Sequence, residues 1–356
     1  MLNAALVPTP DAIPVPWGWL YVLLMLTFLL HVLLMNAMLG GGIIALLSSL
    51  RKNEQSLLIS KEFSYKWPYT IAFAVNMGVA PLLFIQVLYG HFIYSSSVLM
   101  AVWWLSIVVM LILAYYSTYI FDFKFDSLGS MRSLMAGFSV ALLLVIAFLF
   151  SNNMTLMLQP GRWSAYFSDA GGGLLNLSDP TLIPRYLHFV VGAVAIAGLY
   201  LALVSRFNFT KSSVDPAALQ ELGMRYFTGA TAIQILIGFW FLLALPREVM
   251  LLFMGKSAWG TILLTLGLLL TVAALYLGHK RHVVKSALSA LLLMLVMVLM
   301  RDLVRTGYLA PYFSLGDLQV TGEYSPLIFF LVTFVAGLGL VGYMLKLAFD
   351  CRKEVE

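Results

Sequence analysis

The sequence predicts an all-α fold, a polytopic transmembrane helical bundle of about nine spans. Of its 356 residues, 62% are hydrophobic and only 10% are charged, whereas a soluble protein of this length carries about 25% charged residues. The mean hydropathy is +0.95. The charges lie in short clusters that separate apolar runs of about 18 residues or more, the length that crosses a bilayer.

Each apolar run is long enough to cross about 30 Å of hydrocarbon at about 1.5 Å per residue. The nine predicted spans are residues 17–48, 68–93, 98–121, 134–153, 183–204, 226–245, 259–278, 284–304 and 326–347. The longest outer connections are 154–182 and 305–325. No soluble domain is visible, so we expect residues 1–356 to form a single membrane domain.

The distribution of Lys and Arg predicts the orientation of the bundle. With the N-terminus outside, the inner loops and the C-terminal tail hold 15 of the 21 basic residues, Lys52 and Lys346 among them. An excess of cytoplasmic Lys and Arg is typical of membrane proteins, so we expect the N-terminus outside and the C-terminus in the cytoplasm. The net charge of +5 lies mostly in these loops. It therefore indicates a lipid bilayer as the environment and no nucleic acid as a partner.

The ends of the chain carry two further indications. The N-terminal stretch MLNAALVPTPDAIPVPWGW has no basic segment, and its first apolar run is too long for a signal peptide, so we expect that run to remain as a helix. Cys351 is the single cysteine, and no CxxCH motif is present. Any c-type haem would therefore belong to a partner.

Three of the five histidines fall within or at the ends of predicted spans. His31 lies well inside the first span, His91 at the outer end of the second, and His188 near the outer start of the fifth. An ionisable group at such depth is costly and usually faces the bundle interior. Neutral imidazole is also a common axial ligand of haem iron. Haem ligation and a hydrogen bond to a neighbouring helix both remain open for these residues. His279 and His282 fit a basic cytoplasmic anchor instead.

Charged and sulfur-containing side chains near the outer ends add further candidates. Arg301 and Asp302 are adjacent in the sequence. As a catalytic pair, Arg301 would face a haem propionate or a quinone carbonyl and Asp302 would accept a proton. The alternative is a pair at the membrane interface that orients the end of the helix. Arg185, three residues before His188, either reaches a propionate or anchors the helix at the interface. The methionines at 294, 297 and 300 recur at helical spacing, which is more typical of flexible packing than of a row of ligands. Small residues such as those at 40–42 and 192–198 suit close approach of a flat cofactor or of helices.

Several stretches together resemble subunit I of the cytochrome bd quinol oxidase family. The segment LTFLLHVLLMNAMLGGGIIALL looks like the family's first helix, IAFAVNMGVAPLLFIQVLYG its second, FLFSNNMTLMLQP the end of its fourth, and RYLHFVVGAVAIAGL its fifth. The nine-span, N-out topology agrees. The resemblance covers residues 15–205, and residues 206–356 are divergent. It implies that 1–205 is the haem-binding part, that His188 ligates a low-spin b haem, and that His31 ligates an active-site haem.

This sequence also departs from the family's pattern. Gln86 stands where the family has a glutamate, and the third span, AVWWLSIVVMLILAYYSTYI, contains no acid. The Gly-Arg-Gln-Pro-Trp signature is absent, and its nearest counterpart is GYLAPYF at 307–313. The outer quinol-binding loop shrinks to PREVMLLFMGKSAWG. A leucine replaces the methionine expected to pair with His188, and Met250, Met254 or His91 is then the candidate second ligand.

Reduction of oxygen to water consumes protons, and a proton route through a membrane is usually a chain of acids, histidines and water. The acids that this sequence lacks are therefore groups that oxygen reduction needs. The expected function is therefore that of a haem-b subunit that oxidises quinol and passes electrons to an external acceptor. The expected acceptor is a c-type cytochrome partner or another redox subunit. A second membrane subunit is expected in the same complex. The resemblance places it in a bacterial or archaeal inner membrane. Two alternatives are a reduced bd-type quinol:oxygen oxidoreductase, with haem d as an additional cofactor, and a haem-free transporter or structural subunit.

Overall fold

The structure is a computed structural model that describes residues 6–51, 53–168, 170–211 and 213–353. Lys52 and the side chain of Cys351, both used above, lie outside the described part. Within it, nine helices are long and apolar enough to cross a membrane. They are α1 (Trp17–Leu50), α3 (Trp67–Leu99), α4 (Ala101–Phe123), α5 (Met131–Met157), α6 (Leu182–Arg206), α7 (Pro216–Ala244), α9 (Ala258–His279), α10 (Val283–Leu309) and α11 (Ser325–Lys353). The prediction of nine spans in a helical bundle is confirmed.

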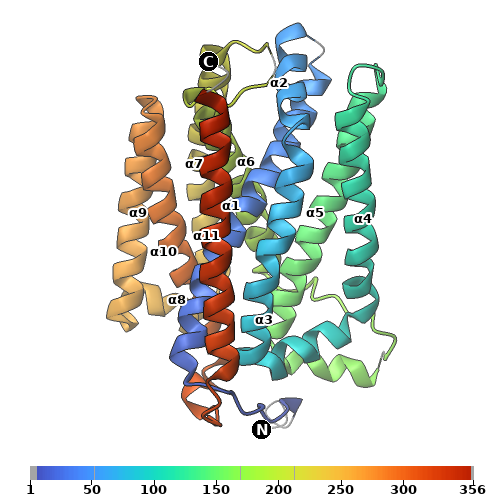
Figure 1. Cartoon of the computed structure of the whole chain (residues 1–356). Coiled ribbons are helices and arrows are strands. Elements are labelled where there is room, and N and C mark those ends of the chain that lie inside the picture. Colours follow the sequence, from blue (N-terminus) through green and yellow to red (C-terminus); the bar gives the residue numbers. More distant parts are fainter. Residues whose placement is uncertain (1–5, 52, 169, 212, 354–356) are drawn as a thin grey trace.

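The helices run up and down in a bundle, and the start of α1 and the end of α11 lie at opposite ends (Figure 1). Because of this alternation, one end of the bundle gathers the ends of α3, α5, α7 and α10 and the starts of α4, α6, α9 and α11. That end is called the outer end here, after the predicted orientation, which itself stays a prediction.

Short elements that were not predicted lie between the spans. They are α2 (Glu54–Ser64), the 3₁₀ helices η2 (Pro160–Phe167) and η4 (Leu315–Asp317), α8 (Arg247–Leu251) and the π-helical turn η3 (Leu252–Lys256). Local capping explains two boundaries. Asn53 accepts a hydrogen bond from Ser56 N at 2.8 Å and starts α2. Asp215 accepts one from Ala217 N at 3.0 Å, so that α7 begins well before the predicted residue 226.

Close contacts between small residues hold the centre of the bundle together. A Cβ atom added to Gly40 on α1 would lie 1.9 Å from the Ala193 carbonyl oxygen on α6. A Cβ atom on Gly198 of α6 would lie 2.6 Å from the Gly223 carbonyl oxygen on α7. Helices approach this closely in membranes where side chains are small. The glycines at 40–42 thus pack against helix backbone and the rings of Phe63 and Trp67. Of the two roles considered for them, close helix packing and contact with a flat cofactor, the structure shows helix packing.

The α9–α10 hairpin lies at one side of the bundle and α4 and α5 at the other, with α11 between them in the view (Figure 1). Helix α6 packs against both α1 and α7, while α9 and α10 pack against each other and reach α7 and α6. At the outer end, the N-terminal segment is fixed to the loop before α11, because Ile13 N donates to Gln319 O at 2.8 Å and Thr321 N donates to Ile13 O at 2.9 Å.

Candidate functional site

A cavity of about 280 Å³ lies between α1, α6, α7, α9 and α10. Its wall is mostly aliphatic and aromatic, with a few polar groups that converge on it, which is the usual character of a cofactor or ligand site. Small residues on three helices, Gly192, Gly238 and Gly267, form part of the wall. The lining also includes Arg185 and His188. Sequence reasoning identified these two residues but not the cavity that joins them.

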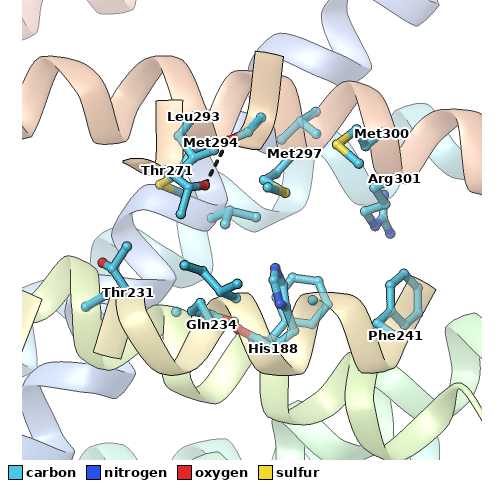
Figure 2. Close-up of a pocket in the computed structure, with 18 of the residues that line it drawn as sticks. His188, Thr231, Gln234, Phe241, Thr271, Leu293, Met294, Met297, Met300 and Arg301 are labelled. Atoms are coloured by element: carbon cyan, nitrogen blue, oxygen red, sulfur yellow. Dashed lines mark hydrogen bonds between the residues drawn. The ribbon is translucent and has the colours of Figure 1, made fainter. Parts of the chain in front are cut away.

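His188 projects from α6 into this cavity, and its imidazole ring points toward α10 (Figure 2). The Nδ1 atom of the ring is buried and has no hydrogen-bond partner among the described residues. The backbone at this position is fixed instead, because Gln234 Nε2 donates to the His188 carbonyl oxygen at 2.5 Å. A buried ring nitrogen without a hydrogen-bond partner is costly unless a ligand engages the ring.

Three methionines of α10 line the cavity wall that faces His188: Met294, Met297 and Met300. Figure 2 shows Met297 opposite the imidazole ring of His188, with Met300 beside Arg301 and Met294 on the other side. A thioether and an imidazole together ligate the haem iron of cytochromes c. From the sequence, these methionines were expected to serve in packing. Their spacing places them on one face of α10, but it does not show that this face lines a cavity.

Two arginines lie at the outer end of the cavity without a carboxylate in ion-pair contact among the described residues. The Arg185 guanidinium lies 5.0 Å from the Phe241 ring centre, and its buried Nε and Nη2 atoms have no hydrogen-bond partner. The Arg301 guanidinium lies 4.2 Å from the Phe28 ring centre and donates to the Met154 sulfur at 3.5 Å. Buried cations normally have an anion beside them, so this end of the cavity is suited to an anionic ligand.

Asp302 does not share the cavity with Arg301. Its carboxylate forms an ion pair with Arg305 and accepts a hydrogen bond from the Tyr21 hydroxyl at 2.7 Å. The Arg305 guanidinium in turn lies 4.3 Å from the Tyr89 ring centre. Asp302 therefore faces α1 and α3, and the two sequence neighbours belong to different environments.

The other two histidines lie outside the cavity. His31 on α1 faces α3, where its Nδ1 atom lies 2.9 Å from the Ala74 carbonyl oxygen and Gly78 leaves room for the ring. If Nδ1 carries the proton, Nε2 is left with a free lone pair, an orientation typical of metal-ligating histidines. His91 packs against the rings of Phe92 and Phe313, with centroid separations of 4.2 and 4.6 Å, and its buried Nε2 atom has no partner among the described residues.

Two further predicted site residues also lie away from the cavity. Met254 belongs to the π-helical turn η3, where its side chain is 56% exposed, and Gly255 beside it has a φ of +105°. Gln86 lies on α3 and is partly buried. Neither residue lines the cavity that contains His188.

A second group of polar side chains lies deeper in the cavity, and the sequence analysis did not single it out. We call it the inner polar ring: Asn36 of α1, Thr231 and Gln234 of α7, and Thr271 of α9. Asn36 is only 5% exposed, and its Oδ1 atom has no partner among the described residues. The Gln234 Oε1 atom is likewise buried and without one. The sequence does show these polar residues inside apolar spans. It does not show that they line the same cavity.

The polar and sulfur-containing groups of the site lie at different levels along the cavity. Figure 2 shows Arg301 at one end, His188 and Met297 facing each other beyond it, and Thr231, Gln234 and Thr271 on the other side of this pair. Among the described residues, no three His, Cys, Asp or Glu side chains form a group that could hold a metal ion.

Comparison with known proteins supports the fold. No protein-family model matches the sequence, and no curated protein matches it. Among solved structures, the chain is similar to the bd oxidase from Geobacillus thermodenitrificans, with a TM-score of 0.70 and 11% sequence identity. The match covers 93% of this chain and 98% of that chain, so it extends well beyond residues 15–205, where the sequence resemblance lies. At this identity the likeness shows a shared fold: the chain is a helical membrane bundle built like that of a bd oxidase.

Proposed function

We propose that this protein is a haem-b membrane subunit that oxidises quinol and passes the electrons to an external acceptor, a c-type cytochrome or another redox subunit. The observation that carries the proposal is the cavity in which His188, whose buried Nδ1 has no hydrogen-bond partner among the described residues, faces Met297, while two arginines without a carboxylate beside them lie at one end. The bd-oxidase fold supports the same class of function.

The residues around the cavity fit a b-type haem. His188 and Met297 would hold its iron, and Arg185 and Arg301 would bind its two propionates, which would supply anions for these arginines. The glycines at 192, 238 and 267 line the cavity and let the side chains of Gln234, His188 and Met297 pack close to the helix backbones. When bound, the haem supplies a one-electron carrier. The protein's own contribution is to fix that carrier, exclude water with the apolar wall, and place positive charge at its outer edge.

His31 is the candidate ligand for a second haem, because its contact with the Ala74 carbonyl leaves Nε2 available on the α1–α3 face. His91 is not retained as a partner of His188, since it packs against Phe92 and Phe313 outside the cavity. Met297 is the candidate second ligand in place of Met254, because Met254 is exposed.

Quinol oxidation releases two electrons and two protons, and the protons must reach water. The Tyr21–Asp302–Arg305 group is a buried polar group at the outer end, next in sequence to Arg301. We propose Asp302 as a proton acceptor within this group and Arg301 as the residue that binds a propionate. The two would then take part in the reaction from different faces of α10.

Quinol turnover with two acceptors tests this function. The purified complex should oxidise quinol when a c-type cytochrome or an artificial one-electron acceptor is present, and should consume little oxygen when none is added. Oxygen consumption at ordinary oxidase rates would instead support the reduced bd-type oxidase. A preparation without bound haem would support the transporter or structural alternative.

A further inference from the structure

A second pocket, of about 240 Å³, lies at the inner end of the bundle, where α6 ends, α7 begins and the chain turns from α9 into α10. The polar side chains that line it are those of Arg206 on α6, Gln220 on α7, and Arg281, His282 and Lys285 at the turn and the start of α10. Three of these carry a positive charge at neutral pH, and none of the described residues in the lining is an acid. We call this the inner basic pocket.

The positive charge of this pocket is only partly balanced by the protein. Glu221 of α7 forms ion pairs with Arg225 at 2.7 Å and with Arg281 at 3.0 Å, so one carboxylate is shared between two arginines. Arg206 and Lys285 have no ion-pair partner among the described residues. An anion that enters the pocket therefore meets two cations that no carboxylate has yet paired.

The first turn of α10 adds backbone donors to these side chains. Helix α10 begins at Val283, and residues 283–285 all line the pocket. The side chain of the N-cap residue His282 forms no capping hydrogen bond, whereas the start of α7 is capped by Asp215. The first amide groups of a helix have no acceptor within the helix, and the helix dipole adds positive potential there. The backbone thus supports the same choice of ligand as the charged side chains.

An apolar stripe runs from this pocket along the exposed face of α10. Val284 lines the pocket and is exposed, and Leu288, Leu291 and Leu295 are exposed at the following positions. Spacings of four, three and four residues place all four side chains on one face of the helix. The stripe is about 16 Å long at about 1.5 Å per residue, which is close to half of the roughly 30 Å hydrocarbon core of a bilayer. A polar pocket that continues into an apolar stripe of this length matches the headgroup and acyl chain of one phospholipid.

We propose that the inner basic pocket binds the phosphate headgroup of an anionic phospholipid, with an acyl chain along the stripe on α10. Basic pockets between helices at a membrane surface suit such headgroups. Arg206 and Lys285 supply the charge, and the Gln220 amide and the first-turn N–H groups of α10 supply hydrogen bonds. Because the headgroup binds α6, α7 and the start of α10 together, it fixes the α9–α10 hairpin to the rest of the bundle. Its binding does not depend on haem, since none of the pocket residues lines the cavity of His188.

The test measures binding of dioleoyl-phosphatidylglycerol and dioleoyl-phosphatidylcholine to the delipidated full complex by native mass spectrometry. The two lipids have the same acyl chains and differ in headgroup charge. The wild type should bind phosphatidylglycerol at least about fivefold more tightly, and the pair Arg206→Gln/Lys285→Gln should weaken that binding by about tenfold or more, as expected for two basic contacts. The pair Arg51→Gln/Lys124→Gln is the matched control, because it removes the same charge from exposed positions at the inner ends of α1 and α4.

Equal binding of the two lipids by the wild type overturns the proposal. An equal loss in the pocket pair and the control pair also overturns it, because the preference would then come from the overall charge of the inner end. Arg206→Lys/Lys285→Arg conserves both charges and should keep the preference, so a loss there contradicts a charge-based site. Inorganic phosphate at the concentration of the lipid should not displace phosphatidylglycerol, since it has no acyl chain. Full displacement by phosphate would assign the pocket to a free anion instead of a lipid.

Discussion

Arg301 and Asp302 are adjacent in sequence but face different sides of α10. The Arg301 guanidinium lies 4.2 Å from the Phe28 ring centre beside the cavity, whereas the Asp302 carboxylate binds Arg305 and Tyr21. The positive charge of Arg301 is therefore not neutralised by its neighbour. This separation leaves a buried cation available to an anionic ligand, and it underlies the first prediction.

Replacing Arg301 with Gln should lower the midpoint potential of the haem held by His188. A nearby positive charge favours the reduced state, and at a separation of about 10 Å with an effective dielectric constant of about 20 the effect is about 70 mV. A spectroelectrochemical titration measures it. Asp302→Asn is the control, and it should shift the potential by less and in the opposite direction. An unchanged potential in Arg301→Gln would mean that this arginine is remote from the haem.

Met297→Leu should convert the haem at His188 from low-spin to high-spin or leave it five-coordinate, because leucine fills similar space and cannot ligate iron. The near-infrared sulfur-to-iron band of the oxidised protein should disappear. Met254→Leu should leave this band intact, since the Met254 side chain is 56% exposed on η3. If the band persists in Met297→Leu but is lost in Met294→Leu or Met300→Leu, a different methionine of the same row is the ligand.

His31→Ala should remove one population of haem and leave the one that depends on His188. The two histidines lie in different places, His31 against the Ala74 carbonyl on α3 and His188 inside the cavity. Haem extraction per mole of protein, with difference spectra, measures the loss. Full haem content in His31→Ala would restrict the protein to the site at His188.

Gly198→Ala should destabilise the bundle. The added Cβ atom would lie 2.6 Å from the Gly223 carbonyl oxygen and 2.8 Å from Phe227 N, so α6 and α7 must move apart. Overpacking of this kind costs about 1 to 3 kcal/mol. Gly229→Ala on α7 has no neighbour within 4 Å and is the control. Thermal unfolding in detergent should show a lower Tm for Gly198→Ala alone, and equal melting of the two variants would contradict the close packing described here.

Much of the fold could be predicted from the sequence, because hydropathy determines which segments cross a bilayer. The starts of α1 and α6 were predicted within one residue. The start of α7 was missed, since polar residues follow its Asp215 cap and lower the hydropathy of its first turns. The turn η3 depends on a positive φ at Gly255, which periodicity does not reveal.

The candidate site could be predicted only in part. Depth and residue type pointed to His188, Arg185 and Arg301, since ionisable groups inside spans are rare. Sequence could not show that Arg301 and Asp302 diverge, because that depends on how α10 is rotated against α1 and α9. For the same reason it could not show that Met297 faces His188 or that Asn36 and Gln234 line the same cavity.

The most direct test of the central claim is a reduced-minus-oxidised optical spectrum, with haem quantified per mole of protein, for the wild type and His188→Ala. His279→Ala is the matched control, since His279 is exposed at the inner end of α9. We expect a b-type spectrum in the wild type and in His279→Ala, and loss of the low-spin component in His188→Ala. Haem that is absent from the wild type, or equally abundant in His188→Ala with an unchanged spectrum, would contradict the account.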